Sequence, residues 1–139
     1  MKTDLSKILS VSGEHGLFRF LAQARSGAIV EPLSGGDRKV FDFHSRITSL
    51  ADISIYTDSG ELKLKEVFLK MKEALSGKKA PGSKSPVNEI KALFDKAVPD
   101  YDGSRFYVSH MKKVVDWYND ILENASFDFV EEGEEPAES

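Results

Sequence analysis

The sequence has no cysteine among its 139 residues, which excludes disulfides, thiolate metal sites and a cysteine nucleophile. It also has no apolar run near the roughly 18 residues that a membrane-spanning helix needs, and its first residues lack the apolar region of a signal peptide. Hydrophobic residues make up 40% of the chain and charged residues 30%, which is typical of a folded globular protein. We therefore expect a cytoplasmic protein without membrane contact.

Recognisable catalytic and metal-binding motifs are missing as well. The histidines His15, His44 and His110 are far apart and none has metal-ligand spacing. No serine stands in a GxSxG context, and the SGGD segment lacks the spacing of a phosphate-binding loop. Asp100 and Asp102 resemble the start of a calcium loop, but the later ligands of such a loop do not follow. The sequence therefore predicts no cofactor, no metal site and no enzymatic activity.

The net charge of −4 is unevenly distributed. The segment Glu123–Ser139 has seven acidic residues, whereas all 19 basic residues precede it. The body of the chain is therefore slightly positive and the end is strongly negative. Because residues 126–139 combine acids with Gly and Pro, we predict a disordered acidic tail over this range.

Residues 1–57 have the pattern of a small β-rich module. Short apolar runs alternate with turn signals at Ser26–Gly27 and at residues 34–37, and Gly27 is expected to supply the positive φ of a hairpin turn. Ile53 and Ile55 alternate as the last of up to five strands. Five short strands with tight turns favour a small closed barrel, which leaves no exposed sheet edge.

Residues 58–125 have helical periodicity. A first apolar stripe ends at Gly77; it consists of Leu64, Val67, Phe68, Met71 and Leu75. The segment 77–86, GKKAPGSKSP, is predicted to be a mobile surface loop because it has little to bury. A second helix is expected from Pro86 with Ser85 as its cap, ending at Pro99. A third helix, capped by Ser109, carries an apolar face that is wide enough to be buried on more than one side.

The segments LSKILSVSGEHGLFRFLAQARSGAIVEPL, ISIYTDSGELKLKEVF and VPDYDGSRFYVSHMKKVVDWYNDIL occur in this order. Together they resemble an uncharacterised family of small two-domain proteins from Bacteroidota, catalogued as domains of unknown function. The resemblance covers residues 3 to 125. It implies an α+β fold, with a small SH3-like β-barrel followed by a three-helix, winged-helix-like domain, and it implies no activity.

The link between the last two helices carries the candidate partner contacts. Tyr101, Arg105, Phe106 and Tyr107 lie there rather than on a helix face, and aromatic side chains with an arginine nearby are common in binding hot spots. The alternative is that these aromatic residues fill the junction between barrel and helices. Our main prediction is a non-catalytic binding or adaptor module with a protein partner.

The alternative function is nucleic-acid binding through cations of the β module and the lysine-rich loop. The predicted contacts are Arg19, Arg25, Arg38, Lys39, Arg46, Lys78 and Lys79. Against this function, the third helix is expected to expose Asp116, Asn119, Asp120 and Glu123 against Lys112 and Lys113. The second half of this face would repel phosphate groups. Neither the partner nor the oligomeric state follows from the sequence.

Overall fold

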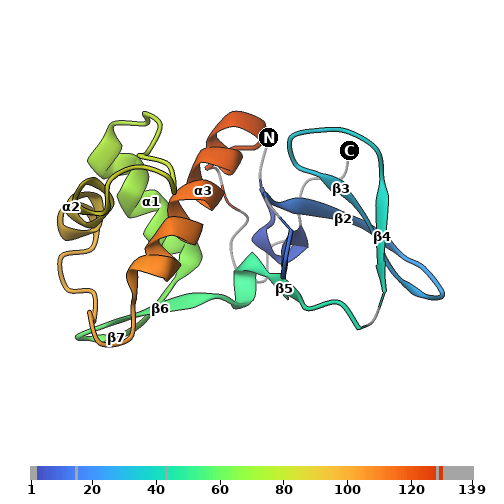
Figure 1. The fold of residues 1–139 in the computed structure, drawn as a ribbon, viewed down its shortest axis with the longest axis horizontal. Coiled ribbons are helices and arrows are strands. Elements are labelled where there is room, and N and C mark those ends of the chain that lie inside the picture. The colour runs from blue at the N-terminus through green and yellow to red at the C-terminus, as the bar shows by residue number, and fades with distance from the viewer. Residues whose placement is uncertain (1–2, 15, 43, 128, 130–139) are drawn as a thin grey trace.

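The computed structural model describes residues 3–14, 16–42, 44–127 and 129. Within these ranges the protein has an α+β fold, as predicted: a five-stranded antiparallel sheet precedes a two-stranded hairpin and three α-helices. The helix α3 (Val108–Asn124) lies between the sheet and the other two helices (Figure 1). None of the helices in the described ranges is long and apolar enough to cross a bilayer.

The five-stranded sheet has the order β4-β3-β2-β1-β5. Its strands are β1 (Ile8–Val11), β2 (Phe18–Gln23), β3 (Gly27–Pro32), β4 (Lys39–Asp42) and β5 (Ile47–Ser49). Two short 3-10 helices flank it, η1 (Leu5–Lys7) and η2 (Leu50–Asp52). In the part of the chain that the structure describes, no ladder joins β4 to β5. The closed SH3-like form of this module therefore stays a prediction.

The hairpin between β2 and β3 turns at the predicted place. Arg25 and Ser26 connect the strands, and the flanking Ala24 and Gly27 exchange backbone hydrogen bonds of 2.7 and 3.4 Å. The predicted reason for the glycine is wrong, because Gly27 is not among the described residues with positive φ. A Cβ at Gly27 would overlap the carbonyl oxygen of Phe41. Glycine is needed here because β4 passes very close to the backbone.

The strand predicted around Ile53 and Ile55 forms as β6 (Ser54–Thr57), but with a different partner. It pairs with β7 (Gly60–Lys63) in a separate hairpin, and over the described ranges no ladder joins it to the five-stranded sheet. The expectation that this strand belongs to the barrel is therefore wrong. Alternating apolar residues identify a strand and its buried face, but they do not specify which strand it pairs with.

The helices α1 (Leu64–Leu75) and α2 (Val87–Ala97) precede α3. Their apolar stripes are buried largely as predicted, and the buried residues are Leu64, Val67, Phe68, Met71, Ile90, Leu93, Phe94 and Ala97. The apolar stripe expected for the second helix began at Val87, which is an exception because 43% of it is exposed. It stands at the first position of its helix, where it points away from the shared core.

The predicted helix caps are wrong. Pro86 is the N-cap of α2 and Tyr107 is the N-cap of α3, whereas Ser109 lies inside the first turn. The start of α3 is set by tertiary packing, because the preceding Phe106 is only 3% exposed and fixes the link against the core. The Tyr107 amide N–H donates to Nδ1 of His110 at 3.3 Å, which is the contact that the N3 side chain of a capping box makes with the N-cap amide.

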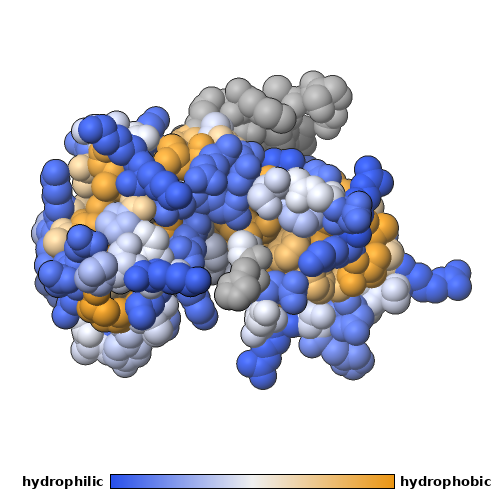
Figure 2. All heavy atoms as spheres, turned by 45° about the horizontal axis from the view of Figure 1, so that its top comes forward, coloured by the Kyte–Doolittle hydropathy of each residue, from blue (hydrophilic) through white to orange (hydrophobic). Residues whose placement is uncertain are grey.

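One hydrophobic core extends through both parts of the molecule. It includes Ile8 and Leu17 from the sheet side together with the buried stripes of the helices. The next residues along the chain, Leu9 and Phe18, belong to a smaller cluster with Val11 and Val30. Neighbouring side chains of a strand point to opposite faces of the sheet. One face of the sheet therefore packs against the helices, and the side chains on the other face pack against one another in the smaller cluster. Figure 2 shows hydrophobic surface over both parts among mostly hydrophilic residues.

The loop 77–86 is fastened to α3 rather than free, which corrects the predicted mobile loop. The side chain of Asn119 accepts a hydrogen bond from the Ala80 amide at 2.8 Å and donates one to the Ala80 carbonyl at 3.0 Å. Tyr118 Oη donates to the carbonyl of Lys78 at 3.0 Å. Ala80 is 5% exposed, so the loop covers part of the core despite its polar composition. The prediction that Asn119 is exposed is wrong, because this loop leaves it only 8% exposed.

The predicted disordered tail begins too early. Phe127 and Phe129 are 8% and 6% exposed, and Phe127 stacks on Tyr118 with ring centroids 4.9 Å apart. A parallel β-bridge joins Phe129 to Thr3 near the start of the chain. Residues 130–139 of the predicted tail lie outside the described residues.

Candidate functional site

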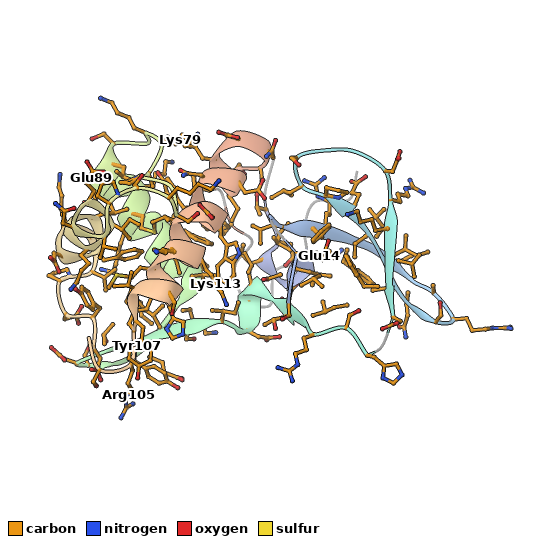
Figure 3. The ribbon with its side chains drawn as sticks, in the orientation of Figure 1. Glu14, Lys79, Glu89, Arg105, Tyr107 and Lys113 are labelled. Carbon is orange, nitrogen blue, oxygen red and sulfur yellow. The ribbon has the colours of Figure 1, made fainter. Side chains whose placement is uncertain are left out.

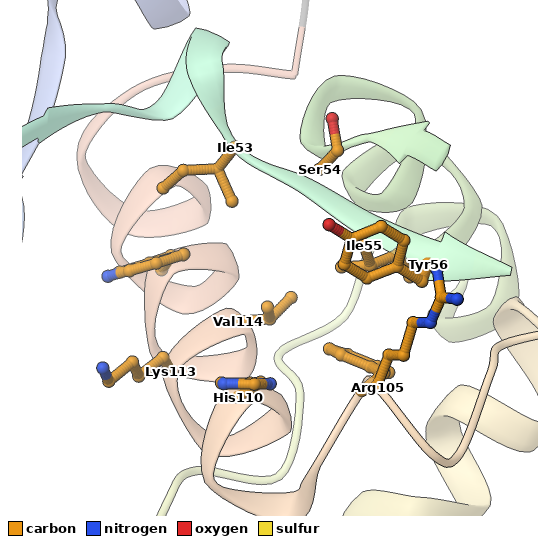
Figure 4. Close-up of a pocket in the computed structure, with 10 residues that line it drawn as sticks. Ile53, Ser54, Ile55, Tyr56, Arg105, His110, Lys113 and Val114 are labelled. Atoms are coloured by element: carbon orange, nitrogen blue, oxygen red, sulfur yellow. The ribbon is translucent and has the colours of Figure 1, made fainter. Parts of the chain in front are cut away.

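A groove of about 260 Å³ lies between β6 and the first half of α3 (Figure 4). We call it the β6–α3 groove. It is lined by Ile53, Ser54, Ile55, Tyr56, Arg105, Phe106, His110, Lys113, Val114 and Trp117. Three elements therefore build it: strand β6, the link before α3, and one face of α3.

The floor of the β6–α3 groove is apolar and rigidly held. Ile55, Phe106 and Val114 are 4%, 3% and 2% exposed. The Phe106 ring packs edge-on against Phe94 of α2 at 5.1 Å between centroids, so the link is anchored in the core. A pre-formed apolar floor with few polar groups around it is typical of binding sites.

The rim of the groove is cationic. Figure 4 shows His110 and Lys113 along the helix wall and Arg105 opposite them beside Tyr56. The guanidinium of Arg105 lies over the Tyr56 ring, 5.0 Å from its centroid, a cation–π contact that orients the charge. No aspartate or glutamate is among the described residues that line the groove, so its local charge is positive.

His110 is held in a defined orientation. Its ring stacks on Phe106 with centroids 6.4 Å apart. Because Nδ1 accepts the hydrogen bond from the Tyr107 amide, the ring proton of neutral His110 lies on Nε2. Within the described ranges Nε2 has no partner in the protein, so it is available to donate to an acceptor in the groove.

Asp102 fixes the link from outside the groove. Its Oδ1 accepts hydrogen bonds from the hydroxyl and the amide of Ser104, at 2.6 and 2.9 Å. These two hydrogen bonds lower the pKa of Asp102, and the charge of Arg105 lowers it further. The ionised carboxylate lies 3.6 Å from Nε of Arg105. Asp102 thus helps to hold Arg105 over Tyr56.

The four predicted partner contacts have different environments. Phe106 is buried and Tyr101 is half-buried. The two rings pack on each other and Phe106 packs on Phe94 of α2, so these contacts lie within the helical part rather than at the predicted junction between barrel and helices. Burial raises the pKa of Tyr101, and a hydrogen bond with Asp95 adds to this rise. Arg105 and Tyr107 are exposed and lie at the same end of the molecule (Figure 3). Their role in partner binding stays a prediction.

The structure does not bring the predicted nucleic-acid contacts together. Arg19 pairs with Glu31 at 3.4 Å and Lys39 with Glu14 at 3.7 Å. The strand register puts Arg19 opposite Glu31 and Lys39 opposite Val30, so Arg19 and Lys39 lie on opposite faces of the sheet.

The remaining cations of this set are spread out further. Arg25 is exposed in the β2–β3 turn, Arg38 just before β4 and Arg46 just before β5. Lys78 and Lys79 belong to the helical part, where Lys79 pairs with Glu123 at 3.4 Å. Figure 3 shows Lys79 far from the end that holds Arg105 and Tyr107. The seven residues therefore do not form one basic surface.

Sequence reasoning missed most of the groove. His110, Lys113, Val114 and Trp117 recur at intervals of three and four, which places them on one face of α3. This spacing is visible in the sequence. The position of Tyr56 opposite them was not visible, because it depends on where β6 lies. No group of three His, Asp or Glu in the described residues converges to hold a metal ion.

Comparison with known proteins agrees with this architecture. Residues 5–50 match the family described as Domain of unknown function (DUF5606), and residues 53–122 match Domain of unknown function (DUF6852). The chain is similar to a solution NMR structure of a structural genomics target from Bacteroides vulgatus, with 32% sequence identity and a TM-score of 0.75. That match covers 90% of this chain and 91% of the other. No curated protein matches the chain.

The fold and the comparisons define an α+β protein in which a β-sheet part and a helical part share one core. The chain belongs to the Bacteroidota family that combines these two domains of unknown function. The resemblance predicted from the sequence is thereby confirmed.

Proposed function

We propose that the protein is a non-catalytic binding module whose β6–α3 groove holds a segment of a protein partner. The observation that carries this proposal is the combination of an apolar floor with an unobstructed cationic and aromatic rim. Tyr56 is 39% exposed and Trp117 is half-buried, although both line the groove. Tyr, Trp and Arg are the residues most enriched in binding hot spots, and the groove contains one of each.

For the finer fold classes we keep the proposal of an SH3-like barrel and a winged-helix-like domain. Five short antiparallel strands within one small module support the first. A β-hairpin next to three helices supports the second. A function cannot be transferred from either class, because such folds host many activities.

The test is a selection of binding peptides from a random displayed library, with the full chain as bait. Selected peptides are then measured against the wild type and against Tyr56→Ala and Lys113→Glu. We expect both groove variants to weaken binding by at least about tenfold, which corresponds to about 1.4 kcal/mol. Lys91→Glu, an exposed lysine of α2 outside the groove, is the matched control and should bind normally. The proposal would be refuted if the selected peptides bound both groove variants as tightly as they bind the wild type.

Nucleic acid is the second candidate, and the same groove gives the observation that favours it. Exposed aromatic rings beside Arg105 and Lys113 are also suited to stacking on unpaired bases. Fluorescence anisotropy with labelled single- and double-stranded oligonucleotides, repeated across salt concentrations, tests this candidate. Micromolar binding that weakens steeply with salt would support it, because released counterions dominate such binding. No binding in low salt would eliminate it.

A further inference from the structure

The outer edge of β6 is only partly paired. On the inner side, β6 forms the ladder with β7. On the outer side, the Asp102 amide donates to the Tyr56 carbonyl at 2.8 Å, and the Asp58 amide donates to the Asp100 carbonyl at 2.8 Å. These two bonds show that the backbone groups of Tyr56 point away from β7, because successive residues of a strand point their polar groups to alternate sides.

The same alternation extends towards the start of β6. Ser54 is two residues before Tyr56, so its N–H and C=O also point to the outer edge. Within the part of the chain that the structure describes, the Tyr56 N–H and both backbone groups of Ser54 have no hydrogen-bond partner. Since Ser54 and Tyr56 both line the β6–α3 groove, the unpaired edge lies along a pre-formed groove rather than on an open surface.

An unpaired strand edge is a template for another extended chain. Peptide recognition by strand addition uses such an edge for affinity and neighbouring pockets for the selection of alternate side chains. Here one wall is the edge of β6, and the other is the helix face with Val114 and Trp117. A helical ligand would leave the edge groups unpaired and buried, which costs free energy.

The charges around the groove determine which side chains a ligand should carry. Arg105, His110 and Lys113 are three side chains that supply hydrogen-bond donors along the rim, and the groove has no lining carboxylate within the described ranges. In an extended segment, every second side chain faces the same way. Acidic side chains would thus meet the cationic rim while the alternating apolar ones meet Ile53, Ile55 and the helix wall.

We propose that the ligand of the β6–α3 groove is an extended, acid-rich segment of a protein partner, which adds a strand to the free edge of β6. This inference rests on the proposed function, because it names the kind of segment that the groove holds.

The test uses the full chain, labelled with ¹⁵N, and four short probes. They are a blocked peptide of alternating Glu and Val, the same peptide with Lys for Glu, a version of the acidic peptide with alternate backbone amides methylated, and an oligothymidylate. We expect the acidic peptide to shift the amide signals of Ser54 and Tyr56 and to slow hydrogen exchange of the Tyr56 amide. The Lys peptide and the methylated peptide should each bind at least about tenfold more weakly, and Lys113→Glu should weaken the acidic peptide similarly while Lys91→Glu should not.

The outcomes separate the two proposals. If the methylated peptide binds as well as its parent, or if no acidic peptide binds at millimolar concentration, strand addition by an acidic segment is refuted. The groove can still pass the library selection in that case, so the proposed function survives. If the selected peptides bind the groove variants and the wild type with equal affinity, the proposed function is refuted as well. If oligothymidylate alone shifts the groove signals, the ligand class is nucleic acid and the inference is overturned.

Discussion

The two halves of α3 have different tasks, although they belong to one continuous helix. In the first half, His110 and Lys113 are exposed and line the β6–α3 groove. In the second half, the polar side chains are used to hold the rest of the chain. Asn119 binds both backbone groups of Ala80, and Asp120 accepts a hydrogen bond from the Leu17 amide at 2.9 Å.

This difference explains how a polar helix can serve as both scaffold and site. Buried polar side chains stabilise a fold only when their partners are fixed, because an unpaired buried group costs about 1–3 kcal/mol. Polar side chains in the second half of α3 form hydrogen bonds with backbone groups of the loop 77–86 and of Leu17. Substitution of a side chain does not remove these backbone groups. In the first half, Nε2 of His110 and Nζ of Lys113 meet no such groups within the described residues, so these donors are left for a ligand. Substitutions in the two halves should therefore have opposite consequences for stability and for binding.

The largest effect is expected just beyond the second half of α3, from Phe127→Ala. Phe127 is buried between Tyr118, Phe68 and Phe129, and truncation leaves a cavity that costs about 3–5 kcal/mol. Chemical denaturation monitored by the single Trp117 measures this cost. Tyr107→Ala removes an exposed aromatic ring, 56% accessible, and should cost far less. Equal losses for the two variants would mean that Phe127 does not pack in solution.

Asn119→Ala is expected to have the next largest effect. It removes two hydrogen bonds and leaves the Ala80 N–H and C=O unpaired in a buried position, so we expect a loss of about 2–3 kcal/mol. Hydrogen exchange should also speed up at the Ala80 amide, because the loop is released. The control is Asn88→Ala on exposed helix surface, which should change stability by less than about 0.5 kcal/mol.

Tyr118→Phe should lower the free energy of unfolding by about 1 kcal/mol, because the hydrogen bond to the Lys78 carbonyl is lost. It should also change the response to alkali. Burial raises the pKa of Tyr118 above its ordinary value of 10.0, so the folded state retains its proton more tightly than the unfolded state does. This contribution is complete below pH 10 and is lost as the pH rises through the folded pKa. The melting temperature should therefore fall less steeply between pH 9 and about pH 11 for Tyr118→Phe than for Tyr107→Phe.

Much of the fold was predictable from the sequence because periodicity reports burial directly. The stripe from Leu64 to Met71 is the clearest case, since its spacing alone places it on the core face. The docked loop was not predictable, because the segment around Ala80 has no apolar pattern and is held by α3 side chains that are distant in sequence, Asn119 and Tyr118 among them. The pairing of β6 failed for a similar reason, as strand partners depend on contacts remote in sequence.

The candidate site shows the same limit. Arg105 was named from the sequence because it stands among aromatic residues, and it does line the groove. Tyr56 and Lys113 were not predicted to share a site, because 57 positions separate them in the sequence and only the folded chain puts them on facing walls. A site made from a strand edge and a helix face leaves no local motif, so its residues resemble ordinary surface residues in the sequence.

The smallest effect on stability should come from the first half of α3, and it sharpens the comparison most. Lys113→Glu exchanges an exposed charge with no ion pair to a described residue, so the free energy of unfolding should change by less than about 0.5 kcal/mol. The same substitution reverses the charge of one of the two lining side chains that carry a fixed positive charge, Arg105 and Lys113, and peptide binding should fall by at least about tenfold. Denaturation and peptide titration on one sample measure both quantities. A variant that loses stability together with binding would show that this half of α3 is scaffold as well, and the division of the helix into two tasks would have to be abandoned.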